Sequence, residues 1–266
     1  MTLVDVSTDR SVRTITLSDV ARRNALSRDM LDALLGAVGA ADSDPNVRVV
    51  VVTNQGPVFC AGADLKVVTS KSGAPSSPRG LAELFQRIRH SPKPYVGRLA
   101  GHCVAGGVGL AAVMDVSVAL DSAHFGFTEV RLGVAPAVIS VVCLEKMRPG
   151  DARELFLRGE RFSALRAAQL GLITRAESSE RFDAVVEDVV NDLLAGEPNA
   201  LALAKRLTYV VPTMGESEAF RETTRWSAEL FASESAAQGI AAALSKQRAP
   251  WVETYGGAKS SIEDER

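Results

Sequence analysis

The sequence predicts an α/β fold with a largely parallel sheet, followed by a helical C-terminal region. Strand-like and helix-like segments alternate over residues 1–179, which is the order expected when helices connect parallel strands. One segment, 47–53, contains four consecutive valines, as is typical of a strand buried on both faces. From residue 180 onwards the segments are all helix-like. We therefore expect an α/β core and a helical region that either covers this core or forms a subunit interface.

The strands are predicted from short runs of β-branched and apolar residues that end at turn-forming residues. In chain order they are 2–7, 12–17, 47–53, 95–100, 116–120 and 172–174. The first two form a hairpin with its turn at 8–10.

The helices are predicted mainly from apolar residues that recur every three or four positions. In chain order they are 27–41, 81–90, 108–114, 138–147, 151–158, 163–170, 181–195, 200–211, 216–232 and 235–248. Ser27 and Ser163 are residue types that cap helix N-termini, and Gly171 suits the position just past a helix end. This order predicts a core at 1–195, a helical oligomerisation region at 196–250 and a flexible tail at 251–266.

Composition excludes several classes of protein. The net charge of −2 gives no basic field to attract nucleic acid. No apolar run reaches the roughly 18 residues that a membrane-spanning helix needs. The polar N-terminus does not look like a signal peptide, and the three widely spaced cysteines predict reduced thiols. We expect a cytoplasmic protein that binds neither nucleic acid nor a membrane.

Common catalytic motifs are absent from the sequence. It contains no P-loop, no G-x-G-x-x-G, no G-x-S-x-G and no metal-binding H-E-x-x-H or C-x-x-C. The histidines at 90, 102 and 124 lie far apart in the sequence, so we interpret each as a surface or core side chain. We therefore expect no metal site.

Two glycine-rich turns, each after a predicted strand, are the candidate site. They are Ala61-Gly62-Ala63-Asp64 and Ala105-Gly106-Gly107. Glycine leaves the backbone N–H groups open to a ligand, and a helix that starts at the second turn directs partial positive charge there. The alternative is that these glycines only let a helix pack closely on a sheet.

Glu129 is the candidate acid or base. It follows another strand among apolar residues, where burial raises the pKa of a carboxyl group and suits it to proton transfer near neutral pH. The alternative is that Glu129 forms an ion pair with Arg131 or another base.

Together these stretches resemble the enoyl-CoA hydratase/isomerase (crotonase) superfamily over about residues 3–250. The matching stretches are 23–26, 59–66, 101–110, 125–133 and 159–172. The resemblance implies a spiral of ββα units with a C-terminal helical region. It also implies a homotrimer or a dimer of trimers. The expected substrate is an acyl-CoA thioester, so coenzyme A enters as part of the substrate and no cofactor is bound permanently.

The resemblance also implies roles for particular residues. The backbone N–H groups of Ala63 and Gly106 would form an oxyanion hole, and Glu129 would transfer the proton. The remaining substrate-binding residues are Ala61, Gly62, Asp64, Leu65, Gly107 and Lys246, and the backbone of 61–65 would hold the adenine end of CoA. Lys246 would approach the CoA phosphates across a subunit boundary, whereas the alternative is a solvated charge at a helix end.

Position 109 leaves the reaction type open. Many hydratases of this family have a second glutamate where this chain has Gly109. The first hypothesis is hydration of a 2-enoyl-CoA with the single carboxylate of Glu129, and residues 129–140 resemble bacterial hydratases of the methylglutaconyl-CoA type. The second is Δ3-Δ2-enoyl-CoA isomerisation. The third is a protein that binds acyl-CoA without catalysis.

Overall fold

The protein contains two β-sheets that share their connections. The computed structural model describes residues 2–64 and 78–256. The large sheet has the strand order β1-β2-β3-β5-β7-β10, and the small one β4-β6-β8-β9. The strands of the large sheet are β1 Val4–Asp9, β2 Val12–Leu17, β3 Val49–Asn54, β5 Tyr95–Leu99, β7 Val116–Leu120 and β10 Arg175–Glu177. Those of the small sheet are β4 Val58–Cys60, β6 His102–Val104, β8 His124–Gly126 and β9 Arg161–Ser163.

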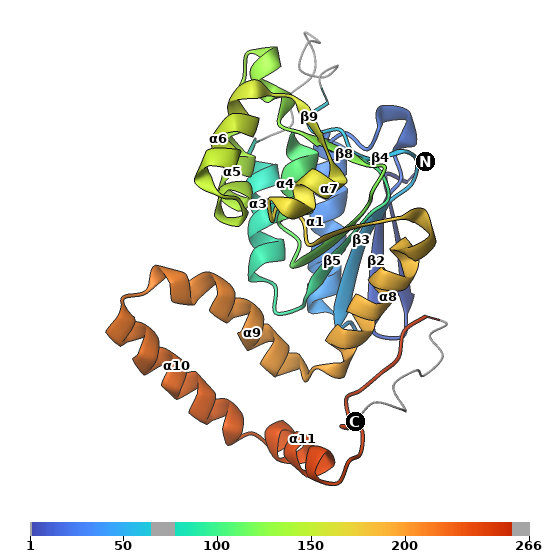
Figure 1. Cartoon of the computed structure of the whole chain (residues 1–266). Coiled ribbons are helices and arrows are strands. Elements are labelled where there is room, and N and C mark those ends of the chain that lie inside the picture. The colour runs from blue at the N-terminus through green and yellow to red at the C-terminus, as the bar shows by residue number, and fades with distance from the viewer. Residues whose placement is uncertain (1, 65–77, 257–266) are drawn as a thin grey trace.

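Helices surround both sheets (Figure 1). Their bounds are α1 Arg28–Ser43, α3 Pro78–His90, α4 Gly106–Ala112, α5 Ala137–Cys143, α6 Pro149–Arg158, α7 Ala164–Gln169, α8 Ser179–Ala195, α9 Pro198–Val210, α10 Glu216–Phe231 and α11 Glu234–Leu244. Short 3₁₀ turns are η1 Val20–Arg22, η2 Thr128–Leu132, η3 Leu144–Lys146 and η4 Val211–Thr213. The predicted caps are confirmed, because Ser27 accepts a hydrogen bond from the N–H of Met30 and Ser163 accepts one from the N–H of Arg166.

Consecutive strands alternate between the two sheets. The pairs β3/β4, β5/β6 and β7/β8 each place their first strand in the large sheet and their second in the small sheet. The strands β2, β3, β5, β7 and β10 run parallel, whereas β1 and β9 pair antiparallel. This repeated arrangement is the expected spiral of ββα units. It brings the loops that follow β4, β6 and β8 to one end of the molecule.

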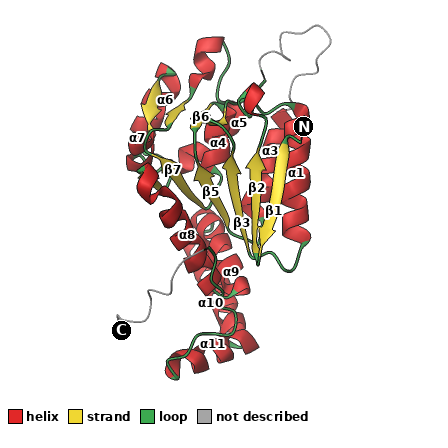
Figure 2. Ribbon diagram, turned by 90° about the vertical axis from the view of Figure 1, so that its right-hand side faces the viewer, coloured by secondary structure: helices red, strands yellow, loops and turns green. Residues whose placement is uncertain are grey.

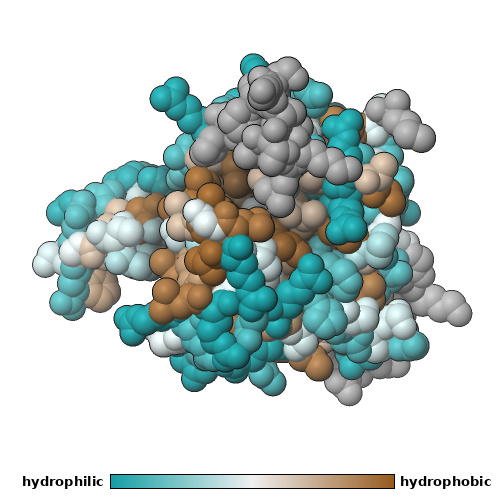
Figure 3. Space-filling view, turned by 90° about the horizontal axis from the view of Figure 1, so that it is seen from above, coloured by the Kyte–Doolittle hydropathy of each residue, from teal (hydrophilic) through white to brown (hydrophobic). Residues whose placement is uncertain are grey.

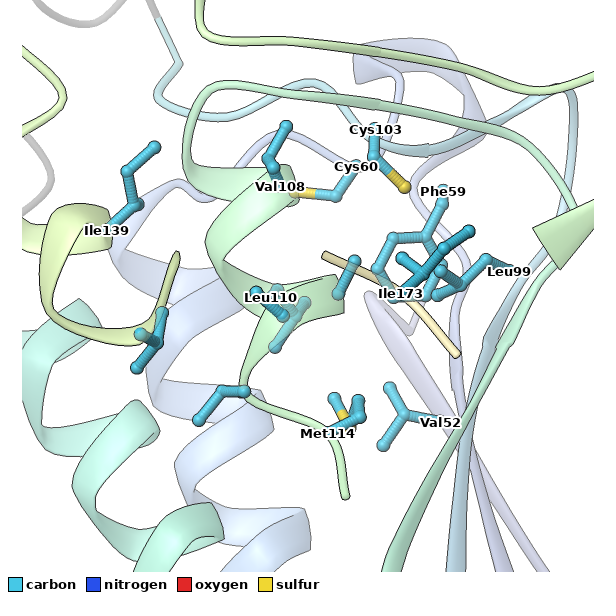
Figure 4. Close-up of a cluster of buried hydrophobic side chains, with 14 of the residues drawn as sticks. Val52, Phe59, Cys60, Leu99, Cys103, Val108, Leu110, Met114, Ile139 and Ile173 are labelled. Atoms are coloured by element: carbon cyan, nitrogen blue, oxygen red, sulfur yellow. The ribbon is translucent and has the colours of Figure 1, made fainter. Parts of the chain in front are cut away.

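The large sheet is buried on both faces, as predicted. Within β3, Val50 and Val52 pack into the main core with α1 and α4, whereas Val49 and Val51 face α8. Figure 2 shows the strands between α8 on one side and α1 on the other. Figure 4 shows the part of the main core around α4, where Phe59 and Leu99 pack on the side of the helix that faces the strands.

Two predicted elements differ from the structure. The strand expected at 172–174 is wrong, because this segment is a turn whose Thr174 N–H bonds to the carbonyl of Ser117 before the chain enters β10. Pairing with β7 begins one residue later, at Arg175 opposite Val118. The helix expected at 138–147 is α5 followed by η3.

The C-terminal region leaves the core after α8. Helices α9, α10 and α11 extend from the end of the molecule opposite the small sheet (Figure 1). The start of the predicted flexible tail is held against α8: the Trp251 indole N–H donates to the carbonyl of Ala195, and Tyr255 and Asn191 exchange two hydrogen bonds. Within the described ranges, no helix has the length and apolar character needed to span a membrane.

Candidate active site

The two glycine-rich turns pack directly against each other. Gly62 has a φ of +80°, and a Cβ placed on it would lie 2.8 Å from the Cβ of Ala105 and 3.0 Å from the backbone nitrogen of Gly106. A side chain at position 62 would therefore strain the backbone and displace the second turn. The close packing of the two turns at Gly62 does not exclude a binding role for them. The same packing fixes the positions of the neighbouring residues Ala63 and Gly106.

The first turn is held by the segment before α1. The N–H of Leu26 donates to the carbonyl of Gly62 at 2.7 Å, and the N–H of Ala61 donates to the carbonyl of Arg23 at 3.1 Å. The buried Asn24 side chain donates to the carbonyl of Val58 at 2.8 Å. These bonds explain why residues 23–26 and the first turn, about 35 positions apart, act as one unit.

The second turn is strained at Ala105. Its φ of 50° and ψ of −120° lie in a region that residues other than glycine rarely adopt, and its N–H is tied to the carbonyl of Gly126 at 2.9 Å. Such strain persists only where the surrounding structure holds it, and it is common at functional sites. Gly107 is needed for close packing, because a side chain there would overlap the backbone of Cys60.

Ala63, Gly106 and Glu129 line one cavity of about 340 Å³. Its other lining residues are mostly apolar and are Leu26, Leu31, Leu81, Ala105, Val134, Ala135, Pro136, Ala137, Val138 and Ile139. No acceptor among the described residues takes the N–H of Ala63 or of Gly106. Two residues whose backbone N–H groups have no acceptor in the described ranges, and one carboxylate, thus belong to the wall of a cavity whose other described lining residues carry no charge.

Glu129 is half-buried in η2, and its Oε2 has no hydrogen-bond partner within the described ranges. Burial raises the pKa of the Glu129 carboxyl group, because the charged form loses hydration. Pairing with Arg131 is ruled out, since the Arg131 guanidinium donates to the carbonyl of Arg158 at 3.3 Å. Glu129 therefore contributes to the cavity wall a half-buried carboxyl group whose Oε2 has no partner among the described residues.

Gly109 lies outside the cavity, behind Ile139. A Cβ placed on Gly109 would lie 2.5 Å from Ile139 Cγ2 and 2.8 Å from Phe85 Cζ. The space that a side chain at 109 would need is thus filled by two apolar groups.

A second cavity, of about 740 Å³, shares Ala63 with the first. Five basic side chains line it: Arg22, Arg23, His102, His124 and Arg161. Ala61 and Asp64, two of the predicted substrate-binding residues, also line this cavity, and Asp64 is buried. The arrangement offers positive charge beside the neutral cavity.

Sequence reasoning missed the histidines of this second cavity. His102 and His124 begin the neighbouring strands β6 and β8, and their rings meet edge to face with centroids 5.4 Å apart. His102 Nδ1 accepts a hydrogen bond from the N–H of His124, and burial lowers the pKa of His102, with smaller contributions from His124 and Arg161. The sequence signal that could have found them is that each histidine is the first residue of the second strand in its strand pair, β5/β6 or β7/β8. Their separation of 22 residues in the chain hides this shared position.

The other predicted site residues are not brought to these cavities. Gly62 and Gly107 are buried beneath the turns, and Leu65 lies outside the described residues. Lys246 is exposed just after α11, at the end of the molecule opposite the small sheet (Figure 1). In residues 2–64 and 78–256, no group of three or more histidine, cysteine, aspartate or glutamate side chains is placed to hold a metal ion.

The end of the molecule that carries the small sheet is seen from above in Figure 3. Apolar side chains form a band there with hydrophilic residues on either side. Val134, which lines the smaller cavity, is one of the exposed apolar residues of the chain.

Comparison with known proteins identifies a matching family and named relatives. Residues 7–254 match the family described as Enoyl-CoA hydratase/isomerase. The chain is 30% identical to Enoyl-CoA hydratase EchA19 of Mycobacterium tuberculosis, over 89% of this chain and 91% of that protein. It is 28% identical to the 2,3-dehydroadipyl-CoA hydratase of Escherichia coli K12, over 91% and 95% of the two chains.

Solved structures of similar proteins share the fold. The enoyl-CoA hydratase of Mycobacterium smegmatis superposes with a TM-score of 0.87 at 30% identity, covering 94% of this chain and 99% of that one. The enoyl-CoA hydratase/isomerase of Marinobacter aquaeolei gives a TM-score of 0.88 at 26% identity, covering 94% and 99%. The chain therefore belongs to the enoyl-CoA hydratase/isomerase family, with the crotonase fold.

Proposed function

We propose that the protein is an enoyl-CoA hydratase, which adds water across the C2=C3 double bond of a 2-enoyl-CoA thioester. The observation that carries this proposal is the single cavity lined by Ala63, Gly106 and Glu129, with two unused N–H groups and an unpaired carboxylate oxygen. The names of the two curated relatives described above, both hydratases, support the same reaction.

The N–H groups of Ala63 and Gly106 act on the thioester oxygen. As water adds at C3, electron density moves to this oxygen and the α-carbon becomes enolate-like. Fixed backbone donors bind the charged oxygen better than the neutral one, which lowers the barrier. The tight packing of the two turns at Gly62 keeps both donors in position before the substrate arrives.

Glu129 carries the proton. Its carboxylate takes one proton from water while the oxygen bonds to C3, and the resulting carboxylic acid returns a proton to C2. Protonation of the enolate at C2 gives the 3-hydroxyacyl-CoA product and restores the carboxylate. No other reactant is consumed. A raised pKa narrows the energy gap between the two protonation states, which suits both halves of this transfer.

The CoA part of the substrate occupies the larger cavity in this proposal. Both cavities are lined by Ala63, so in this proposal a thioester held beside Ala63 has its acyl group in the smaller cavity and its nucleotide in the larger one. The three arginines that line the larger cavity, Arg22, Arg23 and Arg161, complement the negative phosphates of CoA. Coenzyme A thus enters only as part of the substrate.

Isomerisation of a 3-enoyl-CoA is the second candidate. The observation that favours it is Ile139 at the place beside Gly109, where a second acid to orient water has no room. In that reaction Glu129 would take a proton from C2 and return it to C4, with the same two N–H groups on the thioester oxygen.

A direct assay separates the candidates. The protein is incubated with a 2-enoyl-CoA and, separately, with a 3-enoyl-CoA, while the absorbance of the conjugated thioester is followed. Hydration removes the absorbance from the first sample, whereas isomerisation creates it in the second. Binding of both esters without turnover of either would instead favour a non-catalytic acyl-CoA-binding protein and contradict the hydratase proposal.

We also propose that the protein works as a homotrimer or a dimer of trimers. Helices α10 and α11 expose large apolar side chains, among them Phe220, Phe231 and Leu244, which are 68%, 73% and 82% exposed. Apolar surface of this kind marks a contact between chains. Association would also allow Lys246 of a neighbouring chain to approach the CoA phosphates, which it does not reach within its own chain.

A further inference from the structure

The wall beside Gly109 is built from two side chains that come from different helices. Ile139 lies in α5 and is 2% exposed, and Phe85 lies in α3 and is 4% exposed. Both occupy the space in which a side chain at position 109 would have to lie. Figure 4 shows Ile139 on the side of α4 away from Phe59 and Leu99.

Ile139 also faces the cavity, whereas Gly109 and Phe85 do not line it. Its side chain therefore forms the boundary between the cavity and the packed core behind. Two features hold the Ile139 side chain in this place. Its helix α5 packs against α4, and α5 begins directly after Pro136, another residue of the cavity wall. A branched, buried side chain with no room behind it is a rigid boundary.

The rest of the cavity has the character of an apolar acyl site. Within the described ranges, Glu129 is the one ionisable side chain that lines it, and alanine, leucine, valine, isoleucine and proline side chains make up most of the wall. A carboxylate at the far end of an acyl group would lose its hydration in this space without gaining a charged partner from these residues, which is unfavourable.

We propose that Ile139 limits the acyl chain, and that the substrate class is a 2-enoyl-CoA with a short, uncharged, apolar acyl group. This inference rests on the proposed use of the cavity for a CoA thioester. It distinguishes the chain from the Escherichia coli relative named for 2,3-dehydroadipyl-CoA, whose acyl group ends in a carboxylate.

The test compares Ile139→Ala with the matched variant Val142→Ala. Val142 is also buried in α5, at 3% exposure, but it does not line the cavity. Values of kcat/KM are measured for four-carbon and eight-carbon 2-enoyl-CoA esters and for a six-carbon pair with and without a terminal carboxylate. We expect Ile139→Ala to raise the eight-to-four-carbon ratio about tenfold, as one or two methylenes of extra space allow. Val142→Ala should leave the ratio unchanged.

A second comparison distinguishes an effect of the contact between positions 109 and 139 from a loss of folding. Gly109→Ala alone should lower turnover, because its methyl group displaces Ile139, and the double variant with Ile139→Ala should recover part of the loss. Thermal unfolding of each variant identifies any that are not folded. Independent effects of the two changes would contradict the proposed contact.

The outcomes separate this inference from the proposed function. If the wild-type protein turns over the esters but the ratio does not change in Ile139→Ala, or if the carboxylate-ended ester is preferred, the inference is wrong while the hydratase proposal stands. If the wild-type protein turns over none of them, the proposed function fails. The inference is then tested by the affinities for butanoyl-CoA and octanoyl-CoA, whose ratio should change in the same direction in Ile139→Ala.

Discussion

At the scale of single residues, Glu129 lowers the stability of the folded protein and is the proposed acid and base of the reaction. Its carboxylate is half-buried, and its Oε2 has no hydrogen-bond partner in the described ranges, which destabilises the ionised form in the folded protein. In the proposed reaction, the same isolation leaves the group free to exchange a proton with a substrate. Sites of this kind commonly lose stability in return for activity.

Replacing this carboxyl group should therefore change activity and stability in opposite directions. We expect Glu129→Gln to lower kcat by about 10²–10⁴, the usual contribution of a general acid or base. We also expect Tm at pH 7.5 to rise by about 2–4 °C, the shift that roughly 1 kcal/mol produces in a protein of this size. Calorimetry measures Tm, and affinity for a saturated acyl-CoA should stay near that of wild type. Unchanged turnover in this variant would sink the role assigned to Glu129.

The pH dependence of both quantities follows from the raised pKa of Glu129. Hydration needs the carboxylate, so kcat/KM should fall as pH falls through that pKa. Because the folded-state pKa is raised, folding favours the protonated form. Stability should therefore fall as pH rises from the ordinary glutamate pKa, about 4.3, through the raised value. The Tm advantage of Glu129→Gln should accordingly vanish near pH 4; an equal advantage at both pH values would contradict the assignment.

Among the elements, α4 determines where the N–H of Gly106 points. Gly106 is the first residue of this helix, and the strained Ala105 before it is bonded to the carbonyl of Gly126. Proline suits the backbone angle of a first helical position but has no N–H.

The variants Gly106→Pro and Gly106→Ala isolate the donor. Both add a Cβ 3.0 Å from Leu26 Cδ1, and only proline removes the N–H. We expect kcat of the proline variant to lie about 10²–10³ below that of the alanine variant, the usual cost of one lost oxyanion donor. Circular dichroism compares their folding. Equal kcat values in two folded variants would exclude this N–H from the mechanism.

Helix α9 is fixed to the core by Lys205, whose side chain is 8% exposed. Its ammonium group donates to Asp115 at 2.8 Å and to the carbonyls of Ile88 and Lys93. Burial lowers the pKa of Lys205 and raises that of Asp115, opposed in each case by the attraction of the partner. These bonds set the direction in which α9 leaves the core.

Removing this ammonium group should be costly. We expect Lys205→Met to destabilise the protein by about 3–5 kcal/mol in urea unfolding, because the carboxylate of Asp115 stays buried without its partner. Arg28→Met is the control, since the Arg28–Asp32 pair is 72% and 68% exposed and its loss should cost less than about 1 kcal/mol. A similar cost for the two variants would show that Lys205 is not an anchor.

At the scale of the whole molecule, the last three helices bury far fewer side chains than the helix before them. Helices α9 and α11 contain no buried residue, and α10 buries only Trp226, whereas α8 buries six of its residues against the large sheet. The three last helices therefore lack the packing that normally stabilises helices of this length. A second chain would supply it.

Association should depend on the apolar side chains of this region. We expect the wild-type protein to elute as a trimer or hexamer, and the double variant Phe231→Asp/Leu244→Asp to be mainly monomeric in light scattering. Glu229→Gln, an exposed change in the same helix, should leave the mass unchanged. A monomeric wild-type protein would refute the proposal and would leave Lys246 without a route to the CoA phosphates.

Much of the fold follows from local sequence pattern. The valines of β3 predicted burial on both faces, and the hydroxyls of Ser27 and Ser163 predicted two helix starts, because these features depend on neighbouring residues alone. The segment 172–174 misled because its apolar residues Leu172 and Ile173 are buried in a turn. Burial there comes from packing and not from strand pairing.

The sequence by itself determined the α/β core, the order of its helices and of five strands of the large sheet and, through several ordered motifs, the family. The four short strands of the small sheet were not predicted. Only the tertiary structure decided that Ala63, Gly106 and Glu129 line one cavity and that Ile139 and Phe85 fill the space beside Gly109. It also brought His102 and His124 into ring contact. Local pattern reports how a segment pairs with its neighbours in the chain. Contacts between segments distant in sequence depend instead on how the two sheets and their helices pack, which no single segment encodes.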